Sequence, residues 1–402
     1  MRIPDHVLYR LSLLKAIRRS GPVARSELTG LTELSSGSIT QLTGDLLRRG
    51  LIIERKEATK RTGRPRSFLE INAGGAVVVG ASLAGVGKLD VAFIDLMGNR
   101  LHATEMRLGV HTSLSTMASA LAEKLAETIT ESPFAAGDIS RIGIALPALV
   151  DRTKGEVHYM TTFAPDEPVP FAGPISARLG LPVTIENDIS CMARAEHWFG
   201  RARDLETFTL IHVGFAIGSA QYADGLPRAG ANGLNAELGH VKSVVGAAAR
   251  PCFCGGHGCL TAYASMYGML EAASELSGTP FPPTGSLSER FEQFIDRADA
   301  GDVAVQDALR QAGAYLGLAL ANLVNATDPG NILISFTSSR FMAAVAEPMH
   351  QALRAHAMPG MLAGTKIDML IAEADWRWRG TAALALEQTY LGGSSAPIRV
   401  DI

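Results

Sequence analysis

The sequence predicts an α/β protein with two lobes, preceded by a small, mostly helical module. The chain has 402 residues, which is more than one hydrophobic core usually organises, so two or three domains are expected. Helix-period apolar stripes dominate the first 71 residues, whereas strand-like runs such as VVVG and NILIS occur from residue 75 onward. Apolar residues make up 47% of the chain and charged residues 19%, as in ordinary globular proteins.

No signal for export or membrane insertion is evident in the sequence. No run approaches the roughly 18 uninterrupted apolar residues of a membrane span. The amino terminus also lacks a basic region followed by an apolar core and a cleavage site. We therefore expect a cytoplasmic protein without a membrane partner.

Charge is distributed unevenly along the chain. Residues 1 to 71 contain 14 Lys and Arg against 7 Asp and Glu, whereas the rest of the chain contains 23 against 33. A basic amino-terminal module on an acidic body predicts an anionic partner for that module. Nucleic acid is the leading candidate.

Residues 1 to 72 predict a winged helix-turn-helix domain. A first helix ends at Gly21, and a short second helix follows. Ser35 or Ser36 then caps a third helix, which ends at Gly50. Apolar residues at helical spacing form the inner faces of the first and third helices: Val7, Leu8, Leu11, Leu14, Ile17, Ile39, Leu42 and Leu46.

The third helix is the expected recognition helix. Ser36, Ser38 and Gln41 lie off its apolar stripe near the amino-terminal end, where such a helix meets base edges. Their short or amide-bearing side chains suit contacts in the major groove. The alternative for each residue is an ordinary solvated helix face.

Two strand-like runs, LIIERK and SFLEIN, enclose a basic tip and predict the wing. Arg64 stands between a glycine and a proline, which keep it on an extended backbone, and Arg66 follows. An arginine presented in this way suits a narrow, A·T-rich minor groove. The alternative is a flexible basic linker that contacts phosphates only.

Three of the four cysteines lie with a histidine in one short stretch that contains several glycines. The spacing is H-x11-C-x-C-x4-C, and the glycines allow a turn that directs three sulfurs to one point. Four N and S ligands suit a tetrahedral, structural zinc ion, whereas buried thiols or disulfides are the alternative. The predicted Zn²⁺ ligands are His240, Cys252, Cys254 and Cys259.

These segments resemble a known family. The strings AELGH and CFCGGHGCL, downstream of END at residues 186 to 188, are similar to the signature of the ROK family (repressors, open reading frames and sugar kinases). Residues 1 to 71 also resemble the DNA-binding module of ROK repressors, whose linker commonly carries Gly-Arg-Pro. The resemblance implies a two-lobed, actin-like ATPase fold with a zinc ion beside a sugar pocket.

The phosphate-binding segments of a ROK kinase are altered in this chain. Where ROK kinases have G-x-D-x-G-G-T, this sequence has GASLAGV, with Ser82 in place of the aspartate and Ala84 in place of a glycine. The second segment reads GFAIG, with Phe215 at the turn, and Phe336 stands in the third. We therefore predict that the protein is not an enzyme. An active sugar kinase with an appended DNA-binding domain is the alternative.

The sugar side of the expected cleft is retained. In ROK kinases the residue matching Asp188 is the catalytic base, and Asn187 matches another sugar contact. Glu237 and His240 match the second acidic contact and the histidine near the sugar. Thr261 departs from the family, which usually has a glutamate there. The predicted effector contacts are Asn187, Asp188, Glu237 and His240.

The predicted organisation has three parts. A winged helix-turn-helix domain (1–72) precedes a first lobe (73–185) and a second lobe with the zinc site (186–379), and a helix at about 380–395 returns to the first lobe.

The function that fits is a DNA-binding transcriptional regulator of carbohydrate metabolism, expected to be a repressor, acting as a homodimer or dimer of dimers. Its expected partners are operator DNA and a sugar or sugar phosphate, although control by a protein partner stays open. The sequence leaves open the operator, the effector sugar and the direction of regulation.

Overall fold

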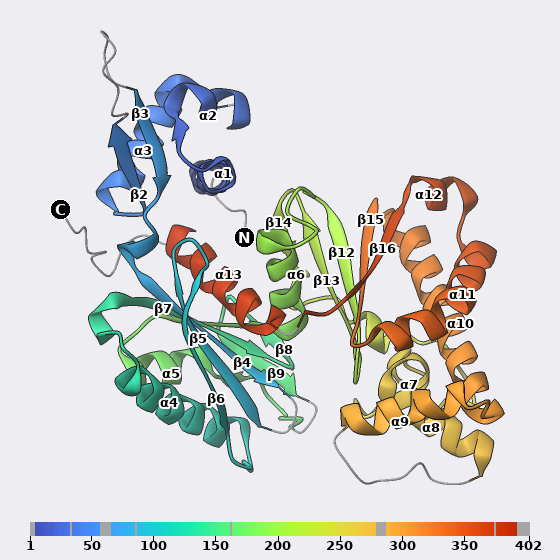
Figure 1. Cartoon of the computed structure of the whole chain (residues 1–402). Helices are drawn as coiled ribbons and strands as arrows, with labels where there is room; N and C mark the ends of the chain where they lie inside the picture. The colour runs from blue at the N-terminus through green and yellow to red at the C-terminus, as the bar shows by residue number, and fades with distance from the viewer. Residues whose placement is uncertain are drawn as a thin grey trace. The chain divides into compact units, whose positions relative to one another are not determined.

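The structure is a computed structural model, which describes residues 5–32, 34–56, 66–84, 87–160, 163–278, 287–373 and 375–391. It divides into two compact units (Figure 1). The first unit comprises Met1–Ala195 and Arg377–Ile402, and the second comprises Glu196–Trp376. The chain therefore passes between the units twice.

The amino-terminal module is a winged helix, as predicted. Its three helices are followed by a hairpin in which Ile52 pairs with Ile71 in antiparallel register. A short strand adds to that hairpin, giving the order β1-β3-β2. The elements are α1 (Asp5–Ser20), β1 (Val23–Ala24), α2 (Arg25–Thr32), α3 (Ser36–Arg48), β2 (Ile52–Lys56) and β3 (Ser67–Ile71).

The limits of α3 follow from its sequence. Ser35 is the N-cap, and its side chain accepts a hydrogen bond from the backbone N–H of Ser38. Ile39 and Leu46 are buried on the inner face, as predicted, whereas Leu42 is only half-buried and Thr43 is buried beside it. Past the C-cap residue Arg49, the backbone turns at Gly50, where φ is +66°.

The first unit is built on a five-stranded sheet with the order β11-β7-β4-β5-β6. Strands β4, β5 and β6 form an antiparallel meander, and β7 and β11 add in parallel. Helices α4 and α5 cover one face of this sheet (Figure 1). The strands are β4 (Val77–Ala84), β5 (Lys88–Asp95), β6 (Arg100–Arg107), β7 (Ile139–Leu146) and β11 (Val183–Asn187), and the helices are η1 (Ala73–Gly75), α4 (Leu114–Glu131), η2 (Ala136–Asp138), α5 (Ala172–Leu179) and α6 (Asp188–Phe199). A small antiparallel sheet beside them contains β8 (Ala148–Asp151), β9 (Glu156–Met160) and β10 (Val169–Pro170).

Helix α13 (Trp376–Leu391) lies against the other face of this sheet (Figure 1). Two strand glycines permit the contact, because a Cβ atom on Gly80 would lie 2.3 Å from Thr381 Oγ1. A Cβ atom on Gly143 would lie 2.6 Å from the backbone oxygen of Thr381. Helix α13 therefore packs directly against the backbone of the first sheet, with no side chain between them at Gly80 and Gly143.

The second unit repeats the strand pattern of the first. Its sheet has the order β14-β13-β12-β15-β16, in which three antiparallel strands are followed by two parallel ones. Its long helices α10 and α11 approach closely, since a Cβ atom on Gly317 would lie 2.2 Å from the Met349 oxygen. The strands are β12 (Phe208–Val213), β13 (Ile217–Ala223), β14 (Leu226–Arg228), β15 (Asn331–Phe336) and β16 (Lys366–Ile371). The helices are η3 (Leu238–His240), α7 (Thr261–Ala264), α8 (Met266–Ser277), α9 (Leu287–Asp299), α10 (Val303–Thr327), α11 (Ser339–His356) and α12 (Pro359–Gly364).

The first unit extends ten residues past the lobe boundary expected at 185, through Ala195. The reason lies in α6, where Arg194 forms ion pairs with Glu186 and Glu387 of the same unit. The predicted α/β class with a winged-helix module is confirmed, while the assignment of functional domains to these units stays a prediction. Among the described residues, no helix combines the length and apolarity needed to cross a membrane.

Candidate metal and effector sites

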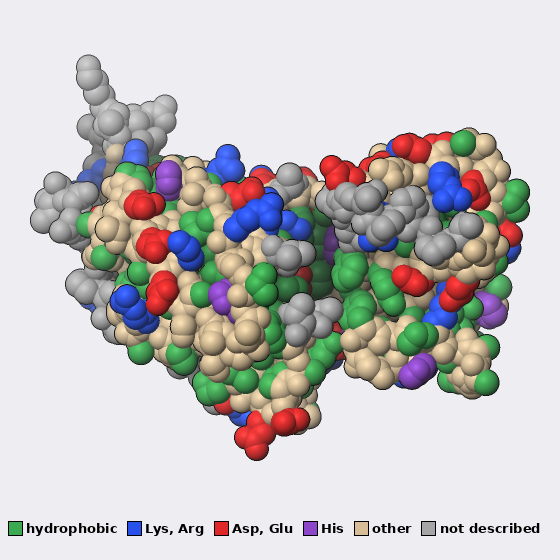
Figure 2. All heavy atoms as spheres, turned by 90° about the horizontal axis from the view of Figure 1, so that it is seen from below, with side chains coloured by type: hydrophobic (Ala, Val, Ile, Leu, Met, Phe, Trp, Pro, Cys, Tyr) green, Lys and Arg blue, Asp and Glu red, His purple; other side chains and the backbone are tan. Residues whose placement is uncertain are grey.

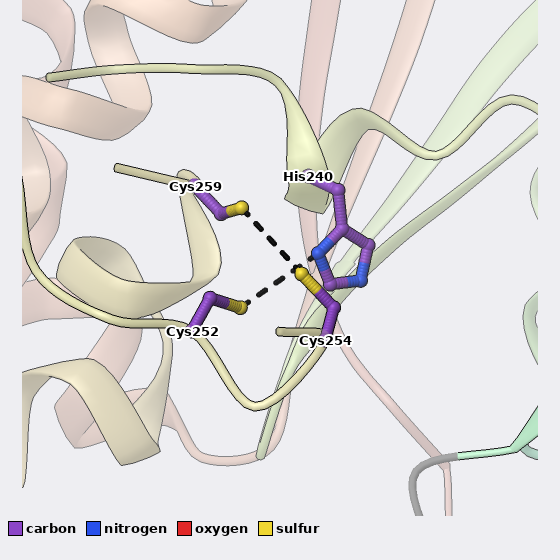
Figure 3. Close-up of side chains that lie close together, drawn as sticks. All are labelled: His240, Cys252, Cys254 and Cys259. Atoms are coloured by element: carbon purple, nitrogen blue, oxygen red, sulfur yellow. Dashed lines mark hydrogen bonds between the residues drawn. The ribbon is translucent and has the colours of Figure 1, made fainter. Parts of the chain in front are cut away.

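The predicted zinc ligands converge in the second unit (Figure 3). His240 ends the single turn η3, and the three cysteines lie in the following loop, where Cys259 comes two residues before α7. Their ligand atoms all lie within 4.8 Å of one another. Gly255 and Gly258 have φ values of +84° and +75°, which supply the turns that the cysteine spacing requires.

The geometry of the cluster suits a tetrahedral cation. Two thiolates about 2.3 Å from a tetrahedral zinc ion stand about 3.8 Å apart. Cys254 Sγ lies 3.7 Å from Cys259 Sγ, and Cys252 Sγ lies 3.8 Å from His240 Nδ1. All four cysteines, including the buried Cys191, are free, so the disulfide alternative is wrong.

The charges around the cluster favour a bound cation. Burial raises the pKa of Cys252 to about 12 and lowers the pKa of His240. The Cys252 thiolate is therefore stable in this space only if positive charge stands near it, whereas hydrogen bonds from the Gly256 backbone and the neighbouring thiols lower the pKa of Cys254 despite its burial. Lys242 adds such charge from outside, because its Nζ lies 3.0 Å from Cys259 Sγ.

Aromatic rings surround the metal-ligand cluster. Phe253, between two of the cysteines, stacks on Phe215 at a centroid distance of 5.9 Å and meets the His240 ring edge-on at 5.9 Å. Phe215 is 45% exposed and stands in the turn between β12 and β13, where a kinase would hold phosphate. The ring that replaces a phosphate-loop residue is thus packed against the cysteine loop.

Thr261 is a buried structural residue here. Its side chain is fully buried, and its Oγ1 accepts a hydrogen bond from the backbone N–H of Ile217 at 3.3 Å. The hydroxyl therefore joins α7 to β13. It does not substitute for the carboxylate that the family resemblance implies at this place.

Asn187 and Asp188 lie in the first unit, at the junction of β11 and α6. The Asn187 side-chain oxygen accepts hydrogen bonds from the backbone N–H groups of Ile189 (2.9 Å) and Ser190 (3.1 Å). Its amide nitrogen donates to the Ala148 carbonyl at 3.1 Å. Asn187 therefore uses much of its hydrogen-bonding capacity in holding this junction.

Asp188 has more capacity left for a ligand. One carboxylate oxygen accepts a hydrogen bond from the Ile189 N–H at 3.0 Å. Burial raises the pKa of Asp188 to about 6, although part of the side chain remains exposed, and the nearby charge of Arg377 opposes this rise. Near neutral pH this group is a poorly solvated acceptor beside a helix start, which suits a hydroxyl donor.

Glu237 and His240 lie in the second unit. Glu237 is exposed directly before η3, and His240 is half-buried. The His240 ring turns Nδ1 toward the sulfurs (Figure 3), which leaves Nε2 for a second partner. The four predicted effector contacts are thus divided between the units, two in each.

The residues in the kinase phosphate segments differ in exposure, since Thr337, directly after Phe336, is exposed and carries a hydroxyl. Ser82 is 1% exposed and faces Asp90 across the antiparallel pair of β4 and β5. Ala84 and Phe336 are also buried. Asp90, which sequence reasoning missed, pairs with Lys88 at 3.4 Å and lies 3.9 Å from Arg377.

The predicted DNA contacts differ in how they are presented. Ser36 and Gln41 are exposed on α3, but Ser38 is half-buried and its hydroxyl lies 2.9 Å from that of the capping Ser35. Thr40, an exposed residue one turn after Ser36, was missed, although helical spacing alone would have found it. Arg66 is exposed before β3, whereas Arg64 lies outside the described residues.

On the face that Figure 2 shows, the described residues carry charges of both signs. Figure 2 shows acidic and basic side chains of the described residues interspersed there, with apolar groups between them. The clearest charge signal for an anionic partner remains that of the amino-terminal module.

Comparisons with known proteins bear on the whole chain. It is 27% identical over 344 residues to the "Putative xylose repressor" of Caldicellulosiruptor sp. (strain Rt8B.4), covering 82% of this chain and 83% of the relative. It is 27% identical over 360 residues to the "DNA-binding transcriptional repressor Mlc" of Escherichia coli (strain K12), covering 87% and 85%. A solved ROK family transcriptional regulator, described as a homolog of the E. coli MLC protein, superposes with a TM-score of 0.79 at 26% identity and covers 96% of both chains. The model of the ROK family matches residues 80–387, so the chain belongs to the ROK family.

Proposed function

We propose that this protein is a transcriptional repressor of carbohydrate genes that binds operator DNA and responds to a sugar. The observation that carries the proposal is a winged helix on the same chain as a ROK domain, in an arrangement that a solved ROK regulator shares over 96% of its length. One relative is named "Putative xylose repressor" and another "DNA-binding transcriptional repressor Mlc". A homodimer or dimer of dimers on an inverted repeat would place two α3 helices in successive major grooves.

Ser36, Gln41 and Arg66 are the proposed DNA contacts among the described residues, and Arg64 is proposed from the sequence alone. Gln41 is the residue best suited to read a base, because an exposed amide can form two hydrogen bonds with adenine. Ser38 is the weakest of the original candidates, since its hydroxyl already lies against Ser35. Its part in the interface is to hold the start of α3.

Zn²⁺ is the proposed cofactor, held by His240, Cys252, Cys254 and Cys259. The 3.7 Å separation of Cys254 and Cys259 supports this metal, as does a ligand set of one imidazole and three sulfurs. The ion would stabilise the loop between β14 and α7. Four protein ligands leave no open position for substrate, so its role would be structural.

Asp188 is the proposed principal effector contact in the first unit, and Asn187 positions it. Glu237 and the Nε2 atom of His240 stay predicted contacts on the second unit. A polyol hydroxyl would donate to the Asp188 carboxylate, and the same group would serve binding without any phosphoryl transfer.

We also propose that the protein lacks kinase activity. The buried Ser82 and the exposed, stacked Phe215 occupy positions where a ROK kinase would grip phosphate. With no carboxylate at position 82 of the first segment and a phenylalanine, Phe215, at the turn of the second, the chain should not hold the metal-bound triphosphate of ATP. Sugar kinase activity is the competing function, and ATP-dependent phosphorylation of any hexose by the purified protein would establish it.

A selection experiment tests the regulator. Duplexes chosen by the protein from a random pool should share an inverted repeat, bind less tightly as salt rises and be released by one member of a sugar panel. A 5- to 150-fold change in affinity is about the usual size of such coupling. Gln41→Ala should reduce binding to the selected duplex more than binding to random DNA. Equal affinity of the wild-type protein for all duplexes would contradict the proposed function.

A further inference from the structure

The two ends of α13 contact different functional segments of the first unit. Near its start, Arg377 Nη1 lies 3.9 Å from Asp90 Oδ2, and its charge acts on the proposed effector contact Asp188. At its other end, the backbone oxygens of Thr389 and Tyr390 accept hydrogen bonds from Arg49, at 3.0 and 3.4 Å. At 1.5 Å per residue, about 20 Å of helix separates these contacts.

Arg49 is the C-cap residue of α3, the proposed recognition helix. The last carbonyls of a helix lack intrahelical partners and carry partial negative charge, so a guanidinium is a favourable ligand for them. The same end of α13 is fixed to the body, because Tyr390 Oη donates to the Leu96 oxygen at 2.5 Å. Arg49 is therefore a direct polar link between the end of α3 and the end of α13.

Between these ends α13 is held as a stiff element. The buried Arg194 donates to Glu387 of α13 at 2.9 Å and contacts Glu186, one residue before Asn187, at 3.0 Å. A Cβ atom on Gly380 would lie 2.3 Å from the Cys191 oxygen, so α13 also meets α6 at backbone distance. Close packing of this kind transmits a displacement instead of absorbing it.

We propose that α13 couples the Asp188 end of the first unit to the recognition helix, and that Arg49 is the positioning residue through which α3 follows α13. The proposal rests on the proposed function, because it assumes that Asp188 meets the effector and that α3 meets DNA. A ligand that binds Asp188 would change the electrostatic interactions of Arg377 with Asp188 and Asp90. That change would shift the start of α13, where Arg377 lies. Arg49 would then carry that shift into the last turn of α3.

A double-mutant cycle read by hydrogen exchange tests the link without DNA or sugar. The full-length variants are Arg377→Met, Arg49→Met and the pair, and the readout is amide exchange in the last turn of α3, residues 45 to 49. We expect Arg377→Met to change that exchange by about fivefold or more with Arg49 present, and by less than about twofold without it. Equal changes in the two backgrounds, or no change in either, would overturn the proposal.

Arg48→Met is the matched control for Arg49. Arg48 is the preceding residue of α3, its side chain is 73% exposed, and it contacts Asp45 at 3.5 Å. This variant should leave the response to Arg377→Met intact. Exchange in β4 verifies that every variant is folded, and Arg49→Lys, which keeps the charge but not the fork of donors, should give an intermediate response.

Sugar binding separates this proposal from the proposed function. The probes are D-xylose, D-glucose and N-acetyl-D-glucosamine. Thermal shift measures binding of each probe to the protein, and release of the selected duplex from the protein measures its effect on DNA binding. A probe that binds the Arg49→Met variant as tightly as the wild type, but no longer releases DNA from it, supports the link. Equal release from both proteins overturns the link and leaves the proposed function standing. A non-additive exchange cycle with no response to any probe supports the link and counts against sugar sensing.

Discussion

The two units share a sheet plan but differ in what is inserted into it and in what holds the insertions. Both sheets contain an antiparallel three-stranded meander followed by two parallel strands. In the first unit the small sheet β8–β10 lies in the chain between the parallel strands β7 and β11, whereas in the second the cysteine loop and the helices α7 to α10 lie between β14 and β15. A common scaffold thus carries different functional segments at different connections.

The means of stabilisation differ as well. In the first unit a buried cation, Arg194, joins β11, α6 and α13 through two carboxylates. In the second, four soft ligands meet around a space suited to a metal, and the cation beside them, Lys242, is exposed. Buried ion pairs stabilise the first unit, whereas the proposed Zn²⁺ would stabilise the second.

Loss of the metal should have the largest effect and should be confined to the second unit. Cys254→Ser is expected to remove bound zinc and cost several kcal/mol, because structural zinc contributes about 10 to 16 kcal/mol of binding energy in small zinc domains. Metal content by mass spectrometry and the melting temperature check this. Cys191→Ala, at the free cysteine of the first unit, should keep one zinc per chain. If a metal-free preparation were as stable as the wild-type protein, zinc would not stabilise the second unit.

Breaking the ion cluster should have the next largest effect and should be confined to the first unit. Glu387→Gln leaves the fully buried Arg194 with one fewer carboxylate, and removing one partner of a buried pair costs about 3 to 5 kcal/mol. Chemical denaturation measures the loss, and zinc content should not change. The matched control is Glu347→Gln, at a carboxylate that is 70% exposed and pairs with Arg354 at 3.6 Å. A similar loss for both variants would contradict the assigned role of burial.

Asp188 should have a smaller effect that depends on pH. Its pKa rises from 3.8 to about 6 in the folded chain, so folding favours the protonated form. The cost of burying the charge is absent below pH 3.8, grows as pH rises through 6 and is complete above it. Asp188→Asn should therefore stabilise the protein by about 1 to 2 kcal/mol at pH 8, allowing for partial exposure, and by nothing at pH 3.5.

Denaturation curves at the two pH values distinguish this from a packing effect. An equal gain at both values would mean that shape, and not charge, changed. Asp188→Asn should also weaken sugar binding while retaining metal and DNA binding. Unaltered affinity for the effector would place the contact elsewhere.

The parts of this architecture that could be predicted are those that depend on local sequence. The caps of α3, the wing strands and the H-x11-C-x-C-x4-C spacing each determine local geometry, and all are as expected. The repeated sheet plan was not predicted, because strand order depends on packing between segments with no evident sequence repeat. Arg194 and Glu387 are 193 residues apart, so the local sequence of neither segment predicts their contact. The same holds for Arg49 and the end of α13.

Lys242 should give the smallest effect and the sharpest contrast with Arg194. A divalent zinc ion with three thiolates carries one net negative charge, which the Lys242 ammonium, 3.0 Å from Cys259 Sγ, balances. Lys242→Met should leave the melting temperature almost unchanged, because the side chain is exposed, but should hasten zinc extraction by a chelator. The difference should shrink in high salt, since mobile ions screen exposed charges. Lys366→Met, at an exposed lysine in β16 of the same unit, is the control. If both variants lose zinc at the wild-type rate, the ammonium does not protect the thiolates, and the ligands alone retain the metal.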